Sequence, residues 1–127
     1  MIYDDLIRQF LLSATALVFL FFCLWALIKP TLLASMLGYE LKTPNSISEF
    51  HAIYVGVFAA QALLCCLAVT RVEDAIVGDL VAVFLLAQPL ARLVAFFRKG
   101  IPIGFLRVLF ILEIIAGLAL LMVRPSL

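Results

Sequence analysis

The sequence predicts an all-α integral membrane protein, an antiparallel up-down four-helix bundle with a short interfacial helix after the first helix. Three observations support this class: the composition, four long apolar segments, and short polar connections between them. Apolar residues make up 67% of the 127 residues and charged residues 13%, against roughly half and a quarter in soluble domains. A soluble chain of this length has too little interior to hide so much apolar surface. The expected partner of the surface is therefore the lipid bilayer.

Each of the four apolar segments is long enough to cross a membrane. A helix needs about 20 apolar residues to span the hydrocarbon core of about 30 Å. The segments run over about 10–28, 50–69, 75–97 and 103–123, within one domain covering 1–127. Asp4 and Asp5 precede the first segment and are unlike the basic start of a signal peptide, so we expect the first helix to be retained.

The connections carry the expected helix signals. Residues 30–37 read as a short amphipathic helix at the membrane interface, closed by Gly38. Residues 43–45 read as a turn, after which Ser46 and Glu49 have the spacing of a capping box that opens the second helix.

The last two segments are joined at a second glycine. Gly100 is expected to cap the third helix, and Pro102 to begin the fourth.

The distribution of charge bears on topology and on partners. Both termini are expected on one side, which carries Arg8, Arg71 and Arg124. The other side carries Lys29, Lys42, Arg98, Lys99 and Arg107. By the positive-inside rule this distribution favours periplasmic termini in a bacterial inner membrane. A net charge of +1 argues against nucleic acid as a partner.

Polar residues inside the apolar segments are the candidate functional residues, because the membrane penalises them. Arg92 lies about 9 Å below the surface by helix rise, and Glu113 lies at a similar depth in the neighbouring helix. We expect these two residues to pair. Gln88 shares a face with Arg92, and Pro89 is expected to kink the third helix.

The second helix has two predicted faces. Small residues form a packing stripe below Glu49, comprising Ala52, Gly56 and Ala60. A second stripe comprises His51, Tyr54, Phe58 and Gln61. Gly117 in the fourth helix is a further candidate for close helix packing. Glu49 could act as a helix cap or as a second carboxylate near Arg92.

Residues 49–56 resemble a known pattern. Glu49-Phe50-His51-Ala52-Ile53-Tyr54-Val55-Gly56 is similar to Glu-x-Arg-Ala-x-Tyr-Gly-Gly, which opens helix two in a bacterial family of small four-helix membrane proteins known only as a domain of unknown function. Ala91-Arg92-Leu93 with Gly100-Ile101-Pro102, and Glu113, are similar to later positions of that family.

The resemblance covers about residues 30–123, and this chain departs from the pattern at His51, Val55 and Ala91. It implies a DoxX-like membrane fold and importance for Glu49, Arg92 and Glu113. It implies no activity.

Three classes of function remain open. The first is an accessory or structural subunit in a homo-oligomer or a larger membrane complex. The second is a binder or transporter of a small lipophilic or ionic molecule, with a lipid or quinone bound near Arg92. The third is a membrane enzyme on a lipophilic substrate, which would need His51 as an acid–base partner of Glu113 or Glu49.

No pattern in the sequence predicts a catalytic residue, a metal site or a cofactor. A dry Arg92–Glu113 pair would favour the first class, and an open cavity beside it would favour the other two.

Overall fold

The computed structural model describes residues 1–100 and 104–126. The chain forms, in order, β1 (Ile2–Tyr3), α1 (Asp5–Ile28), α2 (Pro30–Met36), α3 (Pro44–His51), the π-helical segment η1 (Ala52–Val57), α4 (Phe58–Thr70), α5 (Ala75–Lys99), α6 (Phe105–Met122) and β2 (Val123–Arg124). Four helical stretches are long and apolar enough to cross a membrane: Asp5–Ile28, Pro44–Thr70, Ala75–Arg98 and Phe105–Met122. The predicted class of protein, with four apolar spanning helices, is confirmed.

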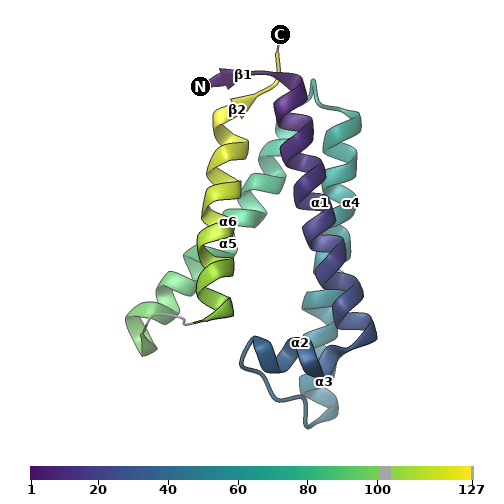
Figure 1. Cartoon of the computed structure of the whole chain (residues 1–127), viewed down its shortest axis with the longest axis vertical. Helices are drawn as coiled ribbons and strands as arrows, with labels where there is room; N and C mark the ends of the chain where they lie inside the picture. Colours follow the sequence, from purple (N-terminus) through teal and green to yellow (C-terminus); the bar gives the residue numbers. More distant parts are fainter. Residues whose placement is uncertain (101–103, 127) are drawn as a thin grey trace.

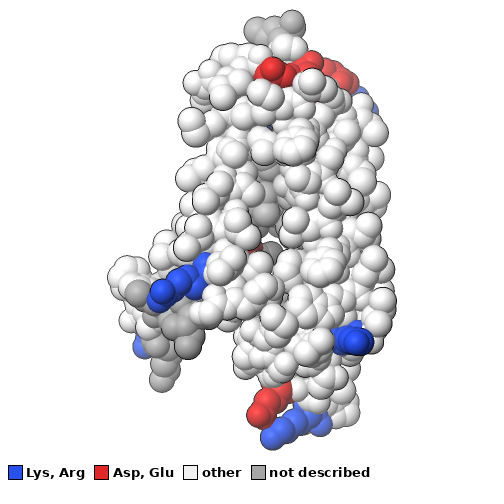
Figure 2. Space-filling view, viewed as in Figure 1, with Lys and Arg blue, Asp and Glu red and all other residues white. Residues whose placement is uncertain are grey.

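The long helices are arranged as two pairs. α1 packs along α4, and α5 packs along α6. Figure 1 shows both termini at one end of the molecule, and the two pairs separating toward the opposite end. Charged side chains gather near the two ends of the face seen in Figure 2, and the surface between them shows few Lys, Arg, Asp or Glu side chains. This distribution is the one expected for a chain that exposes its middle to lipid.

The second spanning helix begins earlier than the sequence predicted. Residues 43–45 do not form a turn before the helix, because Pro44 is already its first residue. The capping box predicted at Ser46 and Glu49 is also wrong. Thr43 is the N-cap instead: its hydroxyl accepts from the Ser46 backbone N–H at 3.1 Å, and the Ser46 hydroxyl accepts from the Thr43 N–H at 3.1 Å. Serine at the third helical position therefore takes the role that the prediction gave to glutamate.

A π-helical segment, η1, interrupts the second spanning helix over Ala52–Val57. Its wider turns, closed by i→i+5 hydrogen bonds, shift the faces of the helix relative to a regular 3.6-residue repeat. Segments of this kind occur frequently at functional sites. The stripes predicted from regular helical spacing cannot run unchanged through this segment.

The other helix ends agree more closely with the sequence. α1 starts at Asp5, five residues before the predicted segment, because the Asp4 carboxylate accepts from the Leu6 and Ile7 N–H groups at 2.9 and 3.2 Å. Gly38 and Gly100 follow their helices with φ of 88° and 100°, as glycine caps require. The predicted helix start at Pro102 lies outside the described residues.

Arg8 joins the helices at the end that carries the termini. Its side chain is only 1% exposed. Nη1 donates to the carbonyls of Leu120 at 2.8 Å and Val123 at 2.5 Å, and Nη2 donates to the carbonyl of Ala75 at 3.1 Å. The first two are carbonyls that the end of α6 would otherwise leave without helical partners. One side chain of α1 thus holds the end of α6 and the start of α5.

Asp79 completes this arrangement, which we call the Arg8 clamp (Arg8, Asp79 and Arg124). Asp79 accepts from Arg8 Nη2 at 3.2 Å and from both terminal nitrogens of Arg124. The hydrogen bond to Asp79 raises the pKa of the Arg124 guanidinium above its ordinary value. The clamp is therefore a charged network across α1, α5 and β2.

Local packing fits the Arg8 clamp closely. A Cβ atom added at Gly78 would lie 2.9 Å from Arg8 Cζ, so only glycine leaves room for the guanidinium there. Nearby, Gln9 Nε2 donates to the Val69 carbonyl at 3.1 Å, and β1 pairs with β2 in parallel. The start of α1 is consequently tied to α4, α5 and α6.

We expect Arg8→Met to destabilise the protein by about 3–5 kcal/mol, the cost of removing one partner from a buried ion pair. Methionine fills the space beside Gly78 but leaves three carbonyls and part of Asp79 without a donor. The free energy of unfolding is measured by titrating SDS into mixed micelles. Arg71→Met, an exposed arginine at the same end, is the control and should change stability by less than about 0.5 kcal/mol. Equal effects of the two substitutions would show that the clamp does not hold the fold.

Candidate intramembrane binding cavity

A cavity of about 250 Å³ lies between the two helix pairs. Most of its wall is apolar, and three aromatic rings contribute to it, those of Phe19, Phe22 and Phe58. Five polar side chains share the wall: Thr15, Tyr54, Gln88, Arg92 and Glu113. Mostly apolar pockets with a few convergent polar groups are typical of small-molecule sites.

The ends of the cavity are closed by different contacts. Toward the termini, the Arg8 clamp draws α1 to α6. Toward the other end, the ring of Phe22 in α1 lies 6.0 Å from that of Phe105 in α6, and the Trp25 ring lies 6.4 Å from Phe105. The two helix pairs are thus in contact at both ends of the cavity, and the cavity lies between these contacts.

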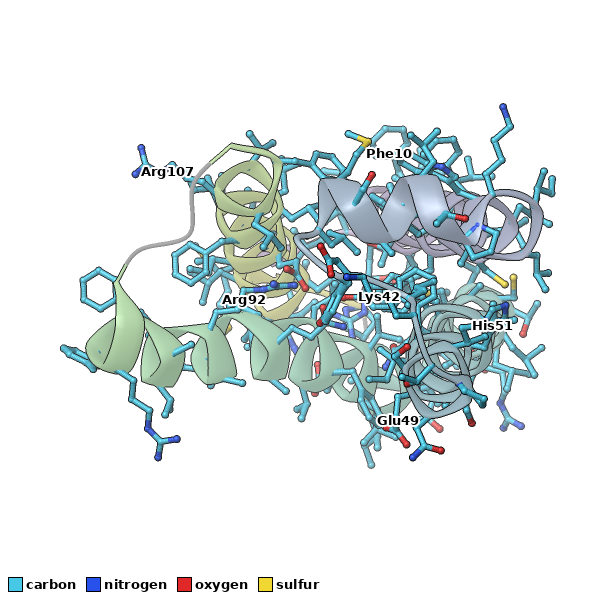
Figure 3. All side chains as sticks on the ribbon, turned by 90° about the horizontal axis from the view of Figure 1, so that it is seen from below. Phe10, Lys42, Glu49, His51, Arg92 and Arg107 are labelled. Carbon is cyan, nitrogen blue, oxygen red and sulfur yellow. The ribbon has the colours of Figure 1, made fainter. Side chains whose placement is uncertain are left out.

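The expected pair of Arg92 and Glu113 is present on the cavity wall. Arg92 Nη2 lies 3.4 Å from Glu113 Oε1, and the two side chains are 24% and 13% exposed. α5 and α6 bring them together as neighbouring helices, and Figure 3 shows Arg92 pointing from α5 toward α6. The pair borders the cavity, so it is not enclosed in a dry core.

The hydrogen bonding of this pair is incomplete. Arg92 Nε and Glu113 Oε1 are buried, and neither makes a hydrogen bond to any residue that the structure describes. Arg8 differs, because its two terminal nitrogens donate to three carbonyls and one carboxylate. Buried polar atoms in proteins are almost always hydrogen-bonded. Both terminal nitrogens of Arg8 are thus hydrogen-bonded within the fold, whereas Arg92 retains a donor beside the cavity.

Two further polar groups extend this part of the wall. Gln88 lies one helical turn before Arg92 on α5, so the two side chains share a face. Tyr54 comes from the π-helical segment of the opposite pair, and its ring lies 5.2 Å from that of Phe58. A polar group placed in the cavity would therefore meet side chains from both helix pairs.

The face between α1 and α6 is hollowed at mid-height, as Figure 2 shows. Val18 of α1 and Leu112 of α6 both line the cavity, and they are 54% and 55% exposed. Because these helices span the membrane, residues exposed at their middle face the lipid. The opening between α1 and α6 is thus apolar and lies at the depth of the acyl chains.

Other candidate residues lie away from this cavity. His51 is partly exposed, and its Nδ1 lies 2.8 Å from the Ile47 carbonyl. Figure 3 shows His51 on the side of the molecule away from Arg92. Glu49 is exposed and makes no ion pair with Arg92 within the described part of the chain. Gln61 is buried at 4% exposure but does not line the cavity. Of the stripe that contains His51, only Tyr54 and Phe58 reach the cavity wall.

A second cavity of about 210 Å³ adjoins the connection between α2 and α3. Glu49 contributes to its wall, and Tyr54 lines both cavities. The Tyr54 ring also packs against Phe50 at 4.7 Å and Tyr39 at 6.2 Å. Tyr54 therefore contributes to the wall of the intramembrane cavity and to that of the second cavity.

The candidate packing residues occupy two kinds of position. Ala52, Gly56 and Ala60 are exposed on the second spanning helix. Gly117 is buried where α6 meets α5, and an added Cβ would lie 2.6 Å from Leu86 Cγ. Gly117 thus permits close approach of α6 to α5 within this chain, whereas the stripe of Ala52, Gly56 and Ala60 lies on the surface.

The chain belongs to a family described as a domain of unknown function (DUF4345), whose sequence model matches residues 7–123. This is a family of the kind that residues 49–56 resemble, and the match extends that resemblance toward the start of the chain. No curated protein and no solved structure matches the chain. Membership in this family assigns no activity to the chain. The relation to DoxX-like proteins remains a prediction.

Sequence reasoning missed the Arg8 clamp and the position of the cavity. Arg8 and Arg124 were predicted to lie on one side of the membrane, and neither of them was given a partner. A usable signal was present: Arg8 and Gln9 lie directly before a long apolar run, and Asp79 lies inside the start of another. Charges at such positions need partners from other helices.

The Arg92–Glu113 pair can be tested by a double-mutant cycle. Arg92→Leu alone should destabilise the protein because it leaves Glu113 without its cation, and adding Glu113→Leu should restore part of the loss. We expect a coupling energy within about 0.5–3 kcal/mol, measured by SDS titration in mixed micelles. A double mutant whose loss equals or exceeds the sum of the single losses would contradict the pairing.

Proposed function

We propose that this protein binds a small lipophilic molecule in the cavity between its helix pairs, with access from the bilayer between α1 and α6. The observation that carries the proposal is the Arg92–Glu113 pair, which borders a cavity and keeps a donor and an acceptor without hydrogen-bond partners. A purely structural pair would be expected to have its buried polar atoms hydrogen-bonded, as the two terminal nitrogens of Arg8 are.

The shape of the site supports a ligand that partitions into lipid. The opening is flanked by exposed apolar side chains such as Val18 and Leu112, and the polar groups lie deeper in the cavity. A molecule from the bilayer would pass apolar surface first and reach Arg92 and Glu113 with its polar part. This order favours an amphiphile over a water-soluble ion.

The other two functional classes have less support. An accessory or structural role in an oligomer rests on the exposed stripe of Ala52, Gly56 and Ala60, which any lipid-facing helix could also carry. The catalytic hypothesis needs His51 beside a carboxylate in a cavity, and His51 lies outside the cavity that Glu113 lines. Binding is the function that the geometry favours.

Photolabelling tests this proposal. The purified protein in lipid nanodiscs is incubated with a ten-carbon alcohol that carries a diazirine in its chain, irradiated, and mapped by mass spectrometry. We expect saturable labelling of the lining segments of α1 and α6. Ala116→Phe should lower the affinity by about tenfold or more, because each factor of ten corresponds to roughly 1.4 kcal/mol of lost binding and the ring would occupy the cavity that Ala116 lines.

Leu118→Phe is the matched control, since Leu118 lies two residues along α6 and faces lipid with 48% exposure. It adds an aromatic ring to the same helix outside the cavity and should leave labelling unchanged. If labelling is not saturable, or if the two variants behave alike, the cavity is not the binding site.

A further inference from the structure

The polar part of the cavity restricts the chemistry of the ligand, given the binding function proposed above. Arg92 and Glu113 are the charged side chains among the described residues of the wall, and they carry opposite charges 3.4 Å apart. The other polar contributors are the amide of Gln88, the phenol of Tyr54 and the hydroxyl of Thr15, which donates to the Leu11 carbonyl at 2.8 Å. The formal charges of the wall therefore cancel.

A fixed charge on the ligand fits this wall poorly. An anion drawn to Arg92 would also lie beside the Glu113 carboxylate, and a cation drawn to Glu113 would lie beside the guanidinium. In an apolar environment such like-charge contacts are only weakly screened, and burial of an uncompensated charge is costly. The Arg92–Glu113 pair thus disfavours both signs of charge.

The two atoms of this pair that make no hydrogen bond are of different kinds. Arg92 Nε is a donor, and Glu113 Oε1 is an acceptor. A hydroxyl group both donates one hydrogen bond and accepts others, as does an amide. A single neutral group of this type could satisfy both atoms, whereas an ionised carboxylate could satisfy only the donor.

The size of the cavity limits the remainder of the ligand. Its volume of about 250 Å³ is slightly below the range of about 300–1,000 Å³ typical of pockets for drug-sized molecules. The wall beyond the polar group is apolar and includes Phe19, Phe22 and Phe58. These dimensions suit one short alkyl chain or a small ring system.

We propose that the ligand is a neutral single-chain amphiphile whose hydroxyl or amide group accepts a hydrogen bond from Arg92 Nε and donates one to Glu113 Oε1.

Competition among matched probes tests this proposal. The photoreactive ten-carbon alcohol is displaced from the protein in nanodiscs at pH 8 by 1-decanol, decanoate, decyltrimethylammonium or decane. Decanoate is ionised at this pH, since carboxylic acids titrate near pH 4 in water. We expect 1-decanol to compete at least about tenfold more strongly than each of the other three.

Two substitutions should change the ranking in opposite directions. Glu113→Gln leaves the guanidinium without its counter-charge, so decanoate should gain at least about tenfold relative to 1-decanol. Arg92→Gln should favour decyltrimethylammonium in the same way. Arg98→Gln, an exposed arginine six residues along α5, is the control and should keep the wild-type ranking. If either cavity variant fails to fold, the wild-type ranking alone still decides the proposal.

The outcomes separate the two proposals. Stronger competition by decanoate or by the ammonium probe would overturn the neutral-ligand inference and leave a charged-ligand site. Equal competition by all four probes, decane included, would overturn it in favour of a purely apolar cavity. Absence of saturable labelling, together with no effect of Ala116→Phe, would overturn the binding function itself.

Discussion

The buried guanidinium of Arg8 is the constraint on which the arrangement of the helices depends. It holds two carbonyls at the end of α6, one at the start of α5, and the Asp79 carboxylate. Without such partners an arginine within a membrane helix is costly, so the helices must meet where it lies. The two pairs are consequently drawn together at this end, and the cavity lies between this contact and the contact of Phe22 and Trp25 with Phe105.

The two buried arginines make different uses of the same chemistry. Arg8 binds fixed backbone carbonyls and contributes to stability, whereas Arg92 has one carboxylate partner and a free donor beside the cavity. A group whose hydrogen bonds are made within the protein stabilises the architecture and has none available for a ligand. A buried donor or acceptor without a hydrogen bond costs free energy, and a ligand that supplies the missing partner removes this cost. The Arg8 clamp supports the proposed binding site by fixing α1 against α5 and α6 at one end of the cavity.

The sequence was sufficient for the features that follow from local pattern. Four apolar runs predicted the four spans, and the depths of Arg92 and Glu113 on neighbouring helices predicted their contact. His51 and Glu49 lie in α3, and the π-helical segment separates them from Phe58 and Gln61, so regular spacing does not carry through the predicted stripe. The Arg8 clamp joins residues up to 115 positions apart, and no local pattern pairs an arginine with the carbonyls of a distant helix end.

The distance along the chain between Arg8 and its partners also sets an order for biosynthesis. Arg8 leaves the ribosome well before Leu120 and Val123, which follow it by 112 and 115 positions. Until α6 is inserted, Arg8 has neither of these acceptors and is held most cheaply at the headgroup level. The first helix can therefore reach its final depth only after the last one has entered the membrane. A nascent chain that stops before α6 leaves the Arg8 guanidinium with only its described partners in α5, Ala75 and Asp79.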